Sequence, residues 1–145
     1  INDIKKQQID KSLLELEITE TANDEQIGQM AMRLKIDGFT LLMDDFGSGY
    51  SSLNVLLETP FDVIKLDKKF MDNMMASGKG KLILEHTVSM ARELGLGLLA
   101  EGVETKEQVD ILGKIGCDNV QGYYFARPMP QEDFFDLLKK DRGIK

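Results

Sequence analysis

The chain has 145 residues, of which 42% are hydrophobic and 30% charged, with a formal net charge of −7. These values are ordinary for one globular domain. The acidic balance argues against a surface that binds a nucleic-acid polymer, because phosphate backbones are held by clustered Lys and Arg. The longest apolar runs, such as LGLGLLA, are far too short to span a bilayer, so we expect no membrane segment.

The two remaining compositional signals concern the compartment and the start of the chain. The single cysteine, Cys117, has no partner for an internal disulfide, which makes a reducing cytoplasm the expected location. The chain starts at Ile1 and its first residues read as half a helix leading into a strand. We therefore expect further residues upstream.

Strand patterns and helix patterns alternate five times along the chain. Leu14, Leu16 and Ile18 alternate with polar residues as in a strand, and FTLLMDD, DVIKLD, LGLLAE and NVQGYYF are further runs of strand length. Helical spacing follows each run. The expected helices lie at 27–34, 53–57, 83–94, 105–116 and 134–138, and the segment MDNMMASGKGK is expected to be a connection.

This alternation predicts an α/β fold with a parallel sheet and right-handed crossovers. An open doubly wound sheet binds ligands at a switch point, whereas a barrel gathers residues from the ends of many strands. Polar residues at the ends of all five strands favour the barrel. Because a closed barrel needs eight strands, we expect residues 1–145 to be the C-terminal five β/α units of an incomplete TIM-like barrel, the C-terminal portion of a single domain.

Those polar residues are the candidate site. They are Glu17, Asp44 and Asp45, Lys65, Glu101 and Glu104, and Gln121, in five successive segments. Charged groups at the ends of apolar strands are costly unless something pairs with them, and a divalent metal with a phosphate ligand would do so. Oxygen-only ligands favour Mg²⁺, Mn²⁺ or Ca²⁺ over a structural zinc.

Each signal also has a purely structural interpretation. The Asp44–Asp45 pair could be a solvated acidic turn, and Glu17 could lie on the exposed face of a strand. Lys65 could pair with Asp67, two residues along the same strand. Likewise, Glu101 and Glu104 could simply precede a helix capped by Thr105, and Gln121 could satisfy backbone groups.

Taken together and in order, the segments LELEITE, DDFGSGYSSL, IKLD, AEGVET and QGYYFARPM resemble the C-terminal part of the EAL domain family of bacterial cyclic-di-GMP phosphodiesterases. The resemblance implies a TIM-like barrel that uses Mg²⁺ or Mn²⁺ in a two-metal site. It implies hydrolysis of one phosphodiester of cyclic-di-GMP, which gives linear pGpG. Two cations would neutralise the phosphodiester, lower the pKa of bound water and stabilise the departing alkoxide.

The resemblance also implies a role for each motif residue. Glu17 and Asp44 would be ligands of the first metal, and Asp44 would bridge to a second metal that Asp45 also holds. Lys65 would orient the attacking water. Glu101 would be a general base or a ligand of the second metal.

Three further residues would support these. Glu104 and Gln121 would support the site and the substrate, and Glu20 would anchor the loop from Asp45 to Ser52, which the family uses to couple dimerisation to activity.

The chain lacks the Glu-Ala-Leu signature, an upstream asparagine ligand and a substrate-contacting arginine. We therefore expect these residues alone to bind metal weakly and to hydrolyse nothing. The open sheet should pair with itself as a homodimer or recruit the missing N-terminal half of the barrel. A catalytically silent EAL-like module that binds cyclic-di-GMP or a protein partner is the alternative; an enolase-type barrel enzyme is a third interpretation, which the ordered motifs disfavour.

Overall fold

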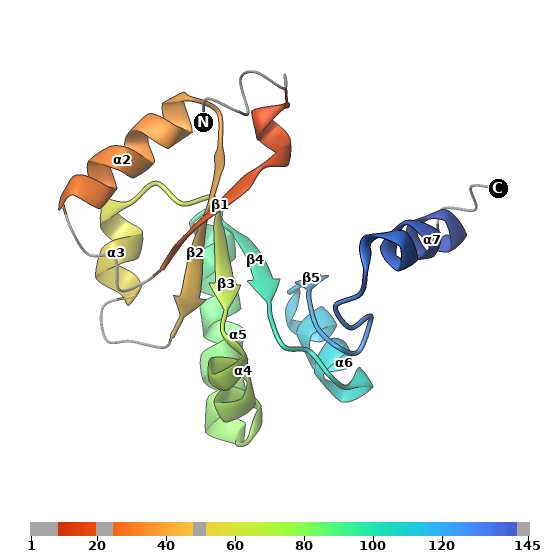
Figure 1. Ribbon diagram of the computed structural model, residues 1–145. Helices are drawn as coiled ribbons and strands as arrows, with labels where there is room; N and C mark the ends of the chain where they lie inside the picture. Colours follow the sequence, from red (N-terminus) through yellow and green to blue (C-terminus); the bar gives the residue numbers. More distant parts are fainter. Residues whose placement is uncertain (1–8, 20–24, 48–51, 142–145) are drawn as a thin grey trace.

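The computed structural model describes residues 9–19, 25–47 and 52–141. Strands and helices alternate along the chain, as Figure 1 shows. The elements are η1 (Lys11–Leu13), β1 (Glu15–Thr19), α2 (Glu25–Ile36), β2 (Thr40–Phe46), α3 (Ser52–Glu58), β3 (Val63–Leu66), α4 (Lys68–Met75), α5 (Gly78–Glu93), β4 (Gly97–Ala100), α6 (Lys106–Ile115), β5 (Asn119–Val120) and α7 (Gln131–Asp141).

The five strands form one parallel sheet in the order β1-β2-β3-β4-β5. The order never reverses, so the sheet has no switch point of the kind that a doubly wound sheet requires. Because crossovers between parallel strands are right-handed, crossovers that always step in one direction place the connecting helices α2, α3, α5 and α6 on the same face. The topology is therefore that of part of a TIM-like barrel, as the sequence predicted.

Alternate residues of each strand pack against the helices. Leu41, Met43, Ile64, Leu66 and Ala100 share one buried core with apolar residues of the helices α2, α3, α5 and α6, among them Ala31, Val55, Val88 and Leu112. Residues of the opposite parity, which include Glu17 and Lys65, therefore project from the other face, because successive side chains of a strand alternate. The polar site residues thus lie on the face that helices do not cover.

Two expected elements differ from the sequence prediction. The segment MDNMMASGKGK is not a connection, since Met71–Met75 end α4 and Gly78–Lys81 form the first turn of α5. Caps explain both helices: the Asp67 carboxylate accepts hydrogen bonds from the first turn of α4, and Ser77 Oγ accepts one from Gly80 N. The last strand is also shorter than NVQGYYF, because only Asn119 and Val120 pair with β4.

The C-terminal helix stands apart from the sheet in Figure 1. Its apolar residues Phe134, Phe135 and Leu137 are between 41% and 49% exposed. Within the described residues, no helix is long and apolar enough to cross a membrane.

Candidate active site at the carboxyl edge of the sheet

Lys65 is the centre of the candidate site. Its Nζ lies 2.6 Å from Oε1 of Glu17, 2.9 Å from Oδ1 of Asp44 and 2.9 Å from Oε1 of Glu101. These carboxylates come from β1, β2 and the residue after β4. Four of the predicted site residues are therefore brought together around one ammonium group, at the carboxyl edge of four strands.

The cluster is electrostatically unbalanced. Lys65 is only 5% exposed, whereas the Glu17 side chain is half exposed. Burial lowers the pKa of Lys65, but the hydrogen bonds to the three carboxylates outweigh this effect and raise its pKa above the ordinary lysine value. One ammonium faces three carboxylates, which leaves negative charge at an edge open to solvent. Such a site attracts a cation.

A β-bulge shapes the Asp44–Asp45 pair. Met43 pairs with Ile64 and Phe46 with Leu66, so β2 advances three residues while β3 advances two. The extra residue lets Met43 and Phe46 both enter the core. Asp45 takes a left-handed backbone with φ 59°. β2 continues through both aspartates to Phe46, so the pair lies near the end of the strand, as the run FTLLMDD predicted, rather than in an acidic turn.

Glu101, Glu104 and Gln121 line a second part of the site. With Lys68, Gly102, Gly122 and Tyr123 they surround a cavity of about 350 Å³. Glu101 belongs to both parts, since it also contacts Lys65. Gln121 follows β5 rather than lying within it.

Backbone contacts between AEGVET and NVQGYYF hold this cavity together. Val103 N donates to Gln121 O at 3.1 Å, and Tyr124 N donates to Val103 O at 3.0 Å. A Cβ on Gly122 would lie 2.1 Å from Val103 O. Only glycine allows the two segments to approach so closely, which explains the glycine of the QGYYF motif.

The structure decides between the alternatives for Lys65. Asp67 accepts hydrogen bonds from the backbone N–H groups of Lys69 and Phe70 and thereby caps α4. Pairing of Lys65 with Asp67 is thus the wrong alternative, and Lys65 instead contacts acids on other strands. Glu20, the expected loop anchor, lies outside the described residues, as do residues 48–51 of the loop.

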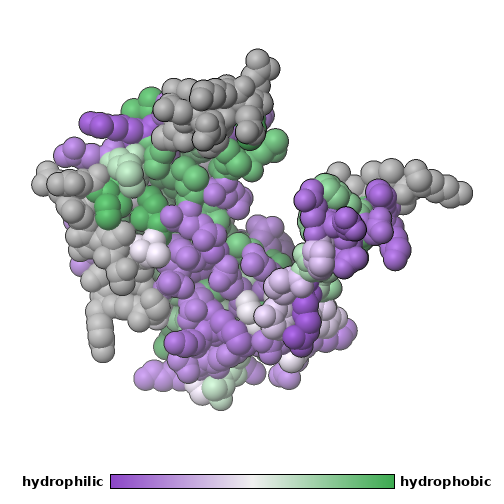
Figure 2. All heavy atoms as spheres, viewed as in Figure 1, coloured by the Kyte–Doolittle hydropathy of each residue, from purple (hydrophilic) through white to green (hydrophobic). Residues whose placement is uncertain are grey.

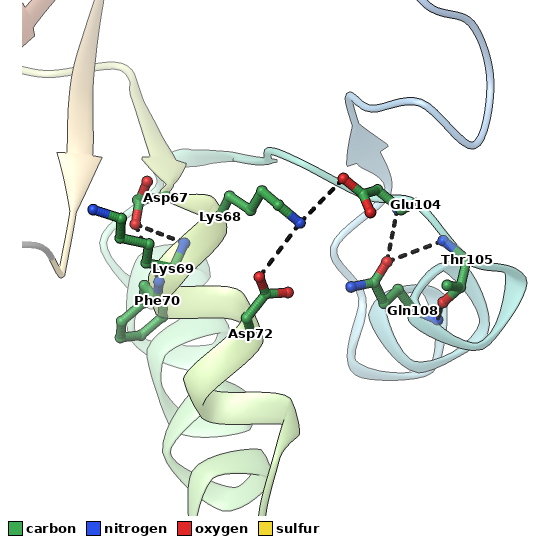
Figure 3. Close-up of polar contacts among 8 residues, drawn as sticks. All are labelled: Asp67, Lys68, Lys69, Phe70, Asp72, Glu104, Thr105 and Gln108. Carbon is green, nitrogen blue, oxygen red and sulfur yellow. Dashed lines mark hydrogen bonds and ion pairs between the residues drawn. The ribbon is translucent and has the colours of Figure 1, made fainter.

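Sequence reasoning missed Lys68. Its Nζ lies 3.2 Å from Oε1 of Glu104 and 3.3 Å from Oδ2 of Asp72 (Figure 3). The sequence feature that could have identified Lys68 is its position directly after Asp67, the N-cap of α4. A cation in the first turn of a helix opposes the helix dipole and so indicates another role for the side chain.

The donor chemistry fits a hard divalent cation, because Glu17, Asp44, Asp45 and Glu101 all provide carboxylate oxygens. As they stand, however, no three His, Cys, Asp or Glu side chains in the described part of the chain are arranged to hold a metal ion. Lys65 lies between three of the carboxylates and supplies the positive charge there.

The distribution of polar residues over the surface agrees with a site at the carboxyl edge of the sheet. β2, β3 and β4 run downward in Figure 1, so their carboxyl ends lie low in that view. Figure 2, seen from the same side, shows hydrophilic residues across the middle and lower part of this face and hydrophobic residues gathered above.

Comparisons with known proteins agree with this geometry. A family model described as "EAL domain" matches residues 1–128. The cyclic di-GMP phosphodiesterase RocR of Pseudomonas aeruginosa is 48% identical over 105 residues, which cover 72% of this chain and 27% of RocR. The chain therefore spans about a quarter of the length of this relative.

Solved structures resemble the fold closely. The EAL domain of Mycobacterium smegmatis DcpA has a TM-score of 0.88 and 30% identity, over 96% of this chain and 64% of that one. A manganese and cyclic-di-GMP complex of Klebsiella pneumoniae BlrP1 has a TM-score of 0.80 and 32% identity, over 88% of this chain and 33% of that one. With the matched family model and the ordered strand-end carboxylates, these likenesses establish that the chain belongs to the EAL domain family.

Proposed function

We infer that this chain belongs to a metal-dependent phosphodiesterase that hydrolyses cyclic-di-GMP to linear pGpG once the domain is complete. One observation carries the proposal: three carboxylates from separate strands converge on the buried Lys65 in a chain of the EAL family. The name of RocR and the ligands of the BlrP1 complex support the choice of substrate.

Glu17, Asp44 and Asp45 are the proposed metal ligands, and Mg²⁺ or Mn²⁺ is the proposed metal. The manganese in the BlrP1 complex supports this pair of ions. A bound divalent cation would supply charge neutralisation of the phosphodiester and a more acidic bound water. The bulge at Asp44–Asp45 supports a shared role for the pair, because in a regular strand adjacent side chains would point to opposite faces.

Lys65 and Glu101 are the proposed catalytic residues. Because the pKa of Lys65 is raised, its ammonium stays protonated at neutral pH and donates hydrogen bonds rather than accepting a proton. That property suits the orientation of a water molecule or a phosphate oxygen. Proton acceptance therefore falls to Glu101, which is 2.9 Å from the ammonium and borders the cavity that Glu104 and Gln121 also line. We assign Glu104 and Gln121 to substrate support.

We further propose that residues 1–145 form the C-terminal portion of one EAL domain and that they are inactive alone. The five strands, against the eight of a closed barrel, support this. So does the 64% share of the DcpA domain that the chain covers. Its proposed partners are a second copy or the N-terminal half of a barrel.

The decisive experiment measures pGpG release from cyclic-di-GMP with Mg²⁺ or Mn²⁺. We expect none from the 145 residues alone and turnover once the remaining strands of an EAL barrel are supplied. In the completed domain, Lys65→Met should lower kcat by about a hundredfold or more. Lys106→Met is the matched control, because Lys106 pairs only with Asp110 on the surface of α6 among the described contacts.

Three other outcomes decide against parts of the proposal. Turnover by the 145 residues alone would refute their predicted inactivity. Binding of cyclic-di-GMP by the completed domain without turnover would favour the silent module. Neither binding nor turnover would overturn the proposed function.

A further inference from the structure

Lys68 connects α4 with the segment between β4 and α6 at the border of the candidate site. It is the first residue of α4. Its ammonium lies between Asp72 on the same helix and Glu104 in the segment between β4 and α6. Figure 3 shows the side chain extending from α4 toward Glu104. The hydrogen bond to Glu104 raises the pKa of Lys68, so the ammonium is charged at neutral pH.

The alkyl stem of Lys68 also passes close over Gly102. A Cβ at Gly102 would lie 2.5 Å from Lys68 Cγ and 2.6 Å from its Cβ, and Gly102 itself has a φ of +65°. The lysine can reach Glu104 only because residue 102 has no side chain. Gly102 and Lys68 therefore belong to one local arrangement.

The backbone and the side chain of Glu104 are held by different partners. Gln108 Oε1 accepts hydrogen bonds from Glu104 N at 2.7 Å and from Thr105 N at 3.0 Å, which fixes the backbone at the start of α6. The Glu104 side chain is 46% exposed. In the described part of the chain its carboxylate forms an ion pair with Lys68. Without the ammonium, the capped backbone would remain while the carboxylate lost its orientation.

We propose that Lys68 is a positioning residue that directs the Glu104 carboxylate into the cavity shared by Glu101 and Gln121, with Asp72 holding the ammonium in place. The proposal deepens the proposed function, on which it rests, by adding a residue that acts through Glu104. Lys68 makes its contact through an exposed ion pair, and such pairs contribute little to stability. Substitution of Lys68 should therefore change the orientation of the Glu104 carboxylate without much change in the stability of the fold.

The first test measures the rotamer of Glu104 in the 145-residue chain by NMR three-bond couplings across its Cα–Cβ bond. We expect couplings of a single rotamer in the wild type and averaged couplings in Lys68→Met. Lys68→Arg, which keeps the charge, should restore the single rotamer. Lys106→Met removes a more exposed lysine near the start of α6 and should leave Glu104 unchanged. Unchanged couplings in Lys68→Met would overturn the proposal.

The second test measures hydrolysis by the completed domain. Lys68→Met should raise KM for cyclic-di-GMP about tenfold with little change in kcat, because an interaction with bound substrate is lost. Asp72→Asn should raise KM by a smaller factor, and neither variant should lower the melting temperature appreciably. A fall in melting temperature without a change in KM would identify Lys68 as merely structural. If the wild-type domain hydrolyses nothing, the proposed function fails, while the couplings still decide on Lys68.

Discussion

Lys65 on β3 and Glu17 on β1 form an ion pair at 2.6 Å although β2 lies between their strands. Neighbouring strands are about 4.8 Å apart, so the two backbones are separated by roughly 10 Å. A lysine and a glutamate are long enough to meet over β2, where Asp44 joins them. The ion pair thus extends across three strands and ties together residues that the barrel architecture brings to one edge.

Replacing Lys65 should destabilise the fold. Lys65→Met leaves three carboxylates close together without their cation, and we expect the free energy of unfolding to fall by about 1–3 kcal/mol. Urea denaturation measures this. Lys106→Met breaks an exposed pair and should cost less than about 1 kcal/mol. Equal losses in the two variants would contradict a central role for the Lys65 cluster.

The contribution of Lys65 should also depend on pH in one direction. Its folded-state pKa is raised above the ordinary 10.5, so the stabilisation is fully present below that pH and is lost as the pH rises toward the folded-state pKa. The difference in unfolding free energy between wild type and Lys65→Met should therefore be constant near neutral pH and shrink above about pH 10.5. Urea denaturation of both proteins from about pH 8 to pH 11.5 checks this. A difference that grew with rising pH would be inconsistent with the raised pKa.

The left-handed backbone of Asp45 predicts an unusual order of stabilities. At φ 59° an alanine is strained by about 1–2 kcal/mol whereas a glycine is not, so Asp45→Gly should be more stable than Asp45→Ala by about 1 kcal/mol. The same two substitutions at Asp110 inside α6 should give the opposite order, because glycine weakens a helix interior. Thermal denaturation of the four variants measures both orders.

Gly122 should tolerate no side chain. Gly122→Ala places a Cβ 2.1 Å from Val103 O and must push the two motif segments apart, at a cost of about 1–3 kcal/mol or more. Gly113→Ala on α6 meets nothing within 4 Å and should be neutral or slightly stabilising. Denaturation midpoints compare the pair, and a mild effect at Gly122 would argue against close contact of the segments.

Metal binding should depend on Glu17, near the carboxyl end of β1, and not on Glu15 at its start. Glu17→Gln should weaken Mn²⁺ binding at least about tenfold, a loss typical even of residues that only support metal ligands. Glu15, two residues earlier on the same face of β1, is the matched control, and Glu15→Gln should have little effect. Calorimetric titration of Mn²⁺ measures both. Equal weakening by the two variants would place the metal away from the carboxyl edge.

Much of the fold was predictable because its signals are local. The alternation of Leu14, Leu16 and Ile18, and the helical spacing of Ile27, Ala31 and Leu34, depend on residues a few positions apart, and β1 and α2 lie where these patterns predict. The division of residues 68–93 into α4 and α5 was missed, because the glycines and lysines of the segment read as a loop while the caps at Asp67 and Ser77 start two helices.

By itself the sequence determined that strands and helices alternate and that carboxylates, a lysine and an amide lie at the ends of the strands. Only the tertiary structure decided which charges meet: Lys65 pairs with Glu17, 48 residues away, rather than with nearby Asp67. It also decided that Asp45 adopts a left-handed backbone conformation at a β-bulge and that Lys68 forms an ion pair with Glu104. The physical reason is that periodicity is set by neighbours along the chain, whereas charge pairing is set by strand register and crossover geometry.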